Sequence, residues 1–323
     1  MRIGYRNPFL ADSESPIAHG RCDQQDSSPL AGPRPQGRRV IRDRERQYAW
    51  LGPGHFGSLI SGPYPDGRRV IWSNGRQQIA KLDYDTLEVL ATLEIGDEAA
   101  TSVADMASDV AGLDDLTGDE AISHAAGVAM RYLTGLDGVY ALLDHDHTLF
   151  LGRKASSVAY TDAVPGDQSS AIVEKARWDK PQEIEGFFVG MNMTPDGRLV
   201  MSTDHGWLVS LKRDFSSYEA VLLPGATEQA AGHCARMEAE RGNTAYGWVR
   251  TSLCCDEAGG IYANSVDHVH KVVWTGEAFS QDPADGAWSA AYRNGTGLGS
   301  GTTPALMGFG PDEDRFVVIG DGD

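Results

Sequence analysis

A Pro-Asp-Gly tripeptide followed by a short apolar run is the sequence feature that most constrains the fold. It occurs in YPDGRRVIWSNGRQQIAKLD (64–83) and in TPDGRLVMSTDHGWLVSLKRD (194–214). Proline presets a φ of about −65° and Asp-Gly tolerates positive φ, so the tripeptide favours a tight turn. The runs that follow are rich in Val, Ile and Leu and are bounded by Gly, Asp and Asn, as strands are. The two segments therefore predict antiparallel hairpins of one repeated type.

Further copies of this hairpin occur along the chain. DEAGGIYANSVDHVHKVVW (256–274) is similar, DHDHTLFLGRKASSVAYTD (144–162) is looser, and GPDEDRFVVIGDGD (310–323) is incomplete. An isolated hairpin is marginal in water and must bury one face against neighbours. Hairpins repeated along a chain are typical of stacked or radial architectures. A ring of four-stranded sheets leaves only short edges unpaired. We predict an all-β protein, a β-propeller of about six blades.

Within each repeat, the run before the turn is predicted to be the first, innermost strand, as in 57–62 and 187–193. Outer strands are predicted at 87–95 and 218–225. The last repeat stops after its second strand, which would expose an unpaired edge. Two explanations stay open. The segment GPRPQGRRVIRDRERQYAW (32–50) echoes GPYPDGRRVIW and could complete the last blade, or the chain is a truncated product.

Two regions depart from the repeat pattern. Residues 1–30 are rich in Ser, Asp, Gln and Pro and are expected to be disordered. Residues 31–323 form the predicted propeller domain, interrupted at 97–130 by an acidic, Ala-rich stretch. We expect this stretch to be a helical insertion on one face.

Charge and hydropathy restrict the partners. The net charge of −18 disfavours nucleic acid and anionic membrane surfaces, which would repel the chain. No run of eighteen apolar residues indicates a transmembrane helix, and the N-terminus lacks the apolar core of a signal peptide. We therefore expect a cytoplasmic protein whose partner is a small-molecule substrate or another protein.

Polar residues recur at equivalent turns, which would meet at one mouth of the propeller channel. Turns between second and third strands contain Asp204-His205 and Asp267-His268, while His55 and Glu185 precede first strands. Asp followed by His or Gly is a common turn pair, which is the simplest explanation. A second explanation is a metal site in which Glu185, Asp204 and Asp267 supply oxygen ligands to calcium. The ion would polarise an ester or lactone carbonyl, with His55 or His205 as general base.

The hairpins that follow Ser/Thr/Tyr-Pro-Asp-Gly resemble the blade signature of the six-bladed gluconolactonase and regucalcin-like superfamily, over residues 55–323. The resemblance implies a divalent cation at the channel mouth, held by Glu, Asn and Asp, and hydrolysis of lactones or organic esters. The adjacent cysteines Cys254-Cys255 are also similar to a pair found near the cofactor of quinone-dependent propeller dehydrogenases.

Three functions follow from these patterns. The first is a metal-dependent hydrolase of lactones or organic esters, with calcium as the cofactor. The second is a non-catalytic binding scaffold that recognises a protein through a propeller face or through 97–130. The third is a quinone-dependent oxidoreductase.

Overall fold

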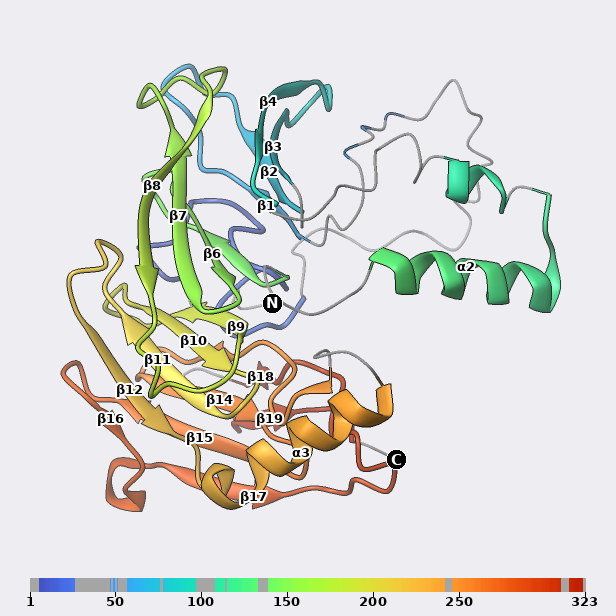
Figure 1. Cartoon of the computed structure of the whole chain (residues 1–323). Coiled ribbons are helices and arrows are strands. Elements are labelled where there is room, and N and C mark those ends of the chain that lie inside the picture. The colour runs from blue at the N-terminus through green and yellow to red at the C-terminus, as the bar shows by residue number, and fades with distance from the viewer. Residues whose placement is uncertain are drawn as a thin grey trace.

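The computed structural model describes residues 6–26, 47, 49, 51, 57–75, 78–96, 108–113, 115–132, 139–241, 246–308 and 314–321. These residues are mainly β and form five antiparallel sheets, so the all-β class is confirmed (Figure 1). The candidate catalytic residue His55 lies outside the described residues, as does much of the 32–50 segment.

Four of the sheets have four consecutive strands in chain order. The first sheet contains β1 (Gly57–Ile60), β2 (Val70–Asn74), β3 (Gln78–Asp83) and β4 (Val89–Glu94). The second contains β5 (Ala141–Leu143), β6 (Leu149–Arg153), β7 (Ser156–Asp162) and β8 (Ile172–Asp179). The third contains β9 (Phe188–Met193), β10 (Leu199–Thr203), β11 (Trp207–Leu211) and β12 (Tyr218–Leu222).

The fourth and fifth sheets are less regular. The fourth contains β13 (Cys254–Cys255), β14 (Gly260–Asn264), β15 (His268–Trp274) and β16 (Phe279–Ser280), and β17 (Trp288–Ala291) also pairs with β15. A short 3-10 helix, Pro283–Asp285, connects β16 to β17. In the fifth, β18 (Ala305–Met307) pairs only with β19 (Phe316–Val318) among the described residues.

The Pro-Asp-Gly turns join first and second strands as predicted. The N–H of Gly67 donates to the carbonyl of Tyr64 at 2.8 Å, and Gly67 has a φ of +84°. The N–H of Gly197 donates to the carbonyl of Thr194 at 2.9 Å, with a φ of +83°. Both glycines occupy the left-handed region that a side chain would strain, which explains the tripeptide. Both Pro-Asp-Gly segments therefore form antiparallel hairpins, β1–β2 and β9–β10.

Consecutive sheets lie beside one another in chain order. Strand β1 contacts β5, β5 contacts β9, and β9 contacts β13, so the first strands of the four larger sheets are neighbours. On the other side, β4 contacts β8 and β12 contacts β16. Each sheet therefore lies against the next one with its first strand beside the first strand of its neighbour, and equivalent turns occupy corresponding positions in the sheets.

The longest helices among the described residues are α2 and α3. Helix α2 (Gly118–Tyr132) lies to one side of the sheets in Figure 1 and overlaps the expected 97–130 insertion. Helix α3 (Ala226–Arg241) follows β12 and was not predicted. No helix in the described parts of the chain combines the length and the apolar character that crossing a bilayer requires.

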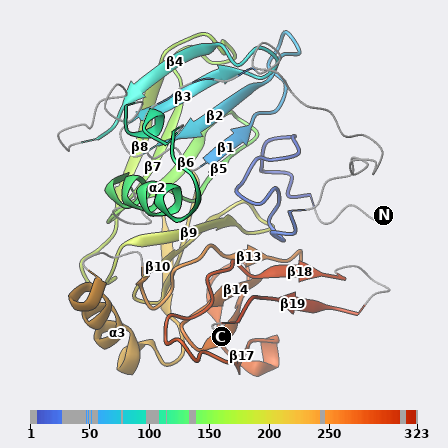
Figure 2. The same ribbon diagram turned by 90° about the vertical axis from the view of Figure 1, so that its right-hand side faces the viewer.

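The expectation that residues 1–30 are disordered is wrong for 6–26. Leu10, Ile17 and Cys22 are buried in the main hydrophobic cluster. The polar composition suggested disorder, but these few apolar side chains suffice to anchor a segment whose backbone is paired. Figure 2 shows this segment, in dark blue, beside β1, β5 and β9.

Backbone hydrogen bonds tie this N-terminal segment to first strands of several sheets. Leu143 of β5 accepts from the N–H of Ala11 at 2.9 Å and donates to the carbonyl of Pro16 at 2.7 Å. The carbonyl of Cys22 accepts from the N–H of Cys255 in β13 at 2.8 Å. Residues 6–26 are therefore paired with the first strands of the second and fourth sheets, β5 and β13.

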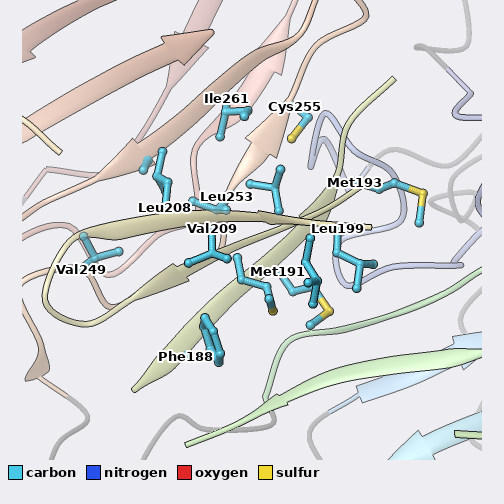
Figure 3. Packing of buried hydrophobic residues seen from close by; sticks show 14 of the residues in the cluster. Phe188, Met191, Met193, Leu199, Leu208, Val209, Val249, Leu253, Cys255 and Ile261 are labelled. Atoms are coloured by element: carbon cyan, nitrogen blue, oxygen red, sulfur yellow. The ribbon is translucent and has the colours of Figure 1, made fainter. Parts of the chain in front are cut away.

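The main core lies between the third and fourth sheets and their neighbours (Figure 3). Phe188 and Met191 of β9 pack with Val209 of β11, and Leu253 and Ile261 bring in the fourth sheet. Burying a side chain of this size contributes about 1.5–3 kcal/mol, so this cluster fixes β9 to β11 firmly. The turns at the ends of these strands are anchored by this packing.

Candidate functional site

A pocket of about 710 Å³ lies between the loop that joins β8 to β9, the β10–β11 turn and helix α3. Its lining includes the ionisable residues Lys180, Glu185, Asp204, His205, Cys234 and Glu238. Three separate parts of the chain therefore supply polar groups to one concave space, as ligand sites require.

Asp204 lines the pocket and is buried. Its Oδ1 accepts from the backbone N–H of Phe187 and from Nδ1 of His205, both at 2.8 Å. Two glycines pack closely against the side chain of Asp204. A Cβ at Gly186 would lie 2.1 Å from Oδ1, and one at Gly247 would lie 2.4 Å from the Cβ of Asp204. The close approach of both backbone segments holds the aspartate in one position.

His205 is charged in this arrangement. Its hydrogen bond to Asp204 raises the pKa of His205 to about 10, with Cys234 adding to the effect and burial opposing it. The ring therefore carries two N–H groups at neutral pH. In this state His205 donates hydrogen bonds and has no lone pair for general-base catalysis.

Cys234 reaches the same point from α3. The helix is Ala-rich and buries Ala226, Ala230, His233 and Met237, which recur at helical spacing on one side. Cys234 directly follows His233, so it lies at the margin of this buried face. Its thiol donates to the backbone carbonyl of Asp204 at 3.6 Å.

The end of α3 is fixed to the chain that follows it. Nε2 of His233 is hydrogen-bonded to the carbonyl of Tyr246 at 3.0 Å. The ring of Tyr246 lies under the guanidinium groups of Arg241 and Arg250, at 4.7 and 5.3 Å from its centre. These contacts fix the chain between α3 and Gly247, and both Cys234 and Gly247 approach Asp204 closely.

One carboxylate oxygen, one imidazole nitrogen and one thiol sulfur converge in this cluster. The ligand atoms of Asp204, His205 and Cys234 all lie within 4.8 Å of one another. Mixed O, N and S ligands suit zinc and similar transition metals, and a site with three protein ligands keeps a position open for water or substrate. Calcium prefers six to eight oxygens, and this cluster supplies one carboxylate.

The structure brings together some of the predicted site residues. Glu185, Asp204 and His205 line the same pocket. Asp267 does not line it; it borders a separate pocket of about 190 Å³ with His268 and His270. The expected three-carboxylate calcium site is therefore not assembled by Glu185, Asp204 and Asp267.

Cys234 is the site residue that the sequence analysis missed. Residues 226–241, ATEQAAGHCARMEAER, contain no proline and are rich in Ala, Glu, Gln and Arg, so a helix could have been predicted there. Nothing in the local sequence shows that this helix would fold back over the β10–β11 turn. The contact joins residues 30 positions apart and depends on the core beneath them.

Comparisons with known proteins do not show a family. No protein-family model matches the chain. An uncharacterised protein of Archaeoglobus fulgidus is 29% identical over 195 residues, covering 58% of this chain. The matched part is 33% of that protein, so the chain spans about a third of this relative's length.

Solved structures resemble the chain only distantly. A functionally unknown protein from Desulfotomaculum acetoxidans has a TM-score of 0.35 and 10% identity, over 61% of this chain and 44% of the other. Sqt1 of Saccharomyces cerevisiae has a TM-score of 0.43 and 9% identity, over 83% of this chain and 57% of the other.

Proposed function

We propose that Asp204, His205 and Cys234 bind a divalent transition metal, with zinc the best match, and that the protein is a metal-dependent hydrolase of esters or lactones. The observation that carries this proposal is the convergence of three different ligand atoms within 4.8 Å of one another, on residues that line a pocket of about 710 Å³. The proposal replaces calcium with zinc because the thiol and the imidazole are poor calcium ligands.

The pocket supplies the other groups that hydrolysis needs. Three protein ligands leave a coordination position for water, and a zinc-bound water has a pKa of about 7. Glu185 and Glu238 are exposed carboxylates that line the pocket, and either could accept a proton from such a water. A bound metal would displace a proton of His205, and this histidine would then serve as a ligand and not as a general base.

We also propose that the five sheets are blades of a β-propeller. The four larger sheets are up-and-down meanders, and their first strands adjoin in chain order. In such a ring, the turn that carries Asp204 and the turn that carries Asp267 belong to the same face. An experimental structure that placed these two turns on opposite faces would contradict the propeller.

The metal is tested on purified full-length protein stripped with a chelator. We expect zinc to bind in a 1:1 ratio, as measured by elemental analysis, and to raise the melting temperature more than calcium or magnesium does. Cys234→Ser and His205→Asn should lose this response. The matched control is His268→Asn, in the other Asp-His turn, which should keep it.

Hydrolysis is then measured on 4-nitrophenyl butyrate and on a γ-lactone. We expect activity that returns when zinc is added and that is lost in Cys234→Ser. Activity that persists in chelator and disappears on alkylation by iodoacetamide would contradict the metal and point to Cys234 as a nucleophile beside the His205 imidazolium. A protein that binds no zinc and hydrolyses neither substrate would refute the proposed function.

A further inference from the structure

Lys180 is a cation of the pocket that is only partly engaged. It directly follows β8, and its backbone N–H donates to the carbonyl of Ala155 at 2.9 Å, so its position is fixed by the second sheet. Among the described residues, its ammonium group donates one hydrogen bond, to the carbonyl of Ile184. An ammonium group has three donors, which leaves two for other partners.

No carboxylate among the described residues lies within ion-pairing distance of Lys180. Asp204 and Glu185 are near enough to favour its charge, but neither forms an ion pair with it at 4.0 Å or less. Burial is the larger influence and lowers the pKa of Lys180, so the ammonium is partly dehydrated. A dehydrated cation with free donors interacts strongly with an anionic group that reaches it.

The other charges of the pocket are placed differently. Glu185 and Glu238 are exposed, whereas Lys180 is half-buried beside Asp204 and His205. The wall formed by α3 is apolar where Ala231, Ala235 and Met237 line the space. A ligand inside the pocket therefore meets an apolar wall on one side and the ammonium of Lys180 close to the Asp204–His205–Cys234 cluster, with Glu185 and Glu238 at exposed positions.

We propose that the substrate carries a carboxylate, which Lys180 binds while the susceptible acyl group lies at the Asp204–His205–Cys234 cluster. This inference rests on the proposed function and names its substrate class: short acyl compounds with an anionic end, such as monoesters of dicarboxylic acids. Lys180 is then a specificity-determining residue, and its charge fixes which end of the substrate faces the cluster.

Binding is tested by calorimetry with the zinc-loaded full chain. Glutarate has a carboxylate at each end, whereas glutaramate has an uncharged amide at one end. We expect glutarate to bind about tenfold more tightly than glutaramate, since a charged hydrogen bond replaces a neutral one. Lys180→Met should abolish this preference, Lys180→Arg should retain it, and the exposed control Lys212→Met should not change it.

Kinetics separate this inference from the proposed function. The wild type should show a KM about tenfold lower for mono-(4-nitrophenyl) glutarate than for 4-nitrophenyl butyrate, and Lys180→Met should raise only the former. Equal KM values for two esters that are both hydrolysed would overturn the role of Lys180 and leave the hydrolase intact. Absence of bound zinc and of any hydrolysis would refute the hydrolase. A glutarate preference that persists in Lys180→Met, or no glutarate binding, also overturns the role of Lys180.

Discussion

The turn that contains Asp204-His205 and the turn that contains Asp267-His268 are locally alike but differ in their surroundings. Both follow the second strand of a four-stranded unit, and in both Nδ1 of the histidine lies 2.8 Å from Oδ1 of the aspartate. The side chain of Asp204 is 5% exposed, whereas that of Asp267 is 38% exposed. The repeated dipeptide therefore produces the same pair twice and a covered site once.

Helix α3 accounts for the difference. It places Cys234 beside the first pair and closes a pocket over it. Next to the second pair, the buried neighbour is His270, whose ring is hydrogen-bonded to Ser289 at 2.8 Å and to Ser265 at 3.0 Å. Turn chemistry alone thus yields a stable Asp-His pair, and a candidate metal site arises only where a third ligand arrives from elsewhere.

The largest expected effect is on metal affinity. His205→Asn removes one of three ligands and should weaken zinc binding by at least about 100-fold, while His268→Asn should leave it unchanged. Competition with a chromogenic chelator measures both. Equal losses in the two variants would mean that the two turns are equivalent, which would contradict the distinction between them.

The next effect is on stability and concerns the glycines that pack closely against Asp204. Gly247→Ala would bring a Cβ to 2.4 Å from that of Asp204, and we expect a loss of about 3 kcal/mol in the free energy of unfolding. Zinc binding should weaken with it.

The matched control is Gly232→Ala in α3, where a Cβ meets no atom within 4 Å. Alanine there should stabilise the helix by up to about 1 kcal/mol. Urea titration of the metal-free proteins measures both changes. A tolerated Gly247→Ala would show that the position of Asp204 is not as constrained as its contacts indicate.

A smaller effect is the loss of stability in acid that His270, next to the Asp267-His268 turn, is expected to cause. Burial lowers the pKa of His270 to about 4, with His268 adding to the effect and Asp267 opposing it. The folded state therefore holds His270 neutral while the unfolded chain takes up its proton near pH 6.5. Between pH 6.5 and about 4 the unfolded state binds more protons, so stability falls as pH falls, by about 2 kcal/mol near pH 4.5.

His270→Gln should remove this acid sensitivity, because an amide does not titrate. We expect urea unfolding at about pH 7 and pH 4.5 to show a smaller acid loss in the variant than in the wild type. The same loss in both proteins would mean that other groups cause the acid sensitivity.

The sequence predicted the two Pro-Asp-Gly hairpins because their determinants are local. Gly67 and Gly197 adopt the positive φ that the tripeptide favours, and the runs after them became β2 and β10. The pairing of Asp204 with His205 is also local. Cys234 could not be assigned to this pair because helix packing over a turn depends on contacts far apart in sequence.

The N-terminal segment, residues 6–26, also could not be predicted correctly from local sequence. Its composition resembles that of a disordered chain, yet Ile17 is wholly buried and pairs with Leu142. Three or four apolar residues do not stand out in a composition average. Their effect depends on the open strand edges that the rest of the chain presents.

The hydrogen bonds of residues 6–26 also imply an order of assembly. The carbonyl of Asp23 accepts from the N–H of Leu306, and the side chain of Gln25 donates to the carbonyl of Leu306, 281 positions later. Leu306 is synthesised long after residues 6–26. Because folding accompanies synthesis, these two hydrogen bonds form late. Asp23 and Gln25 can therefore meet their partners only after the fifth sheet has been made, whereas Ala11 and Pro16 can already pair with β5.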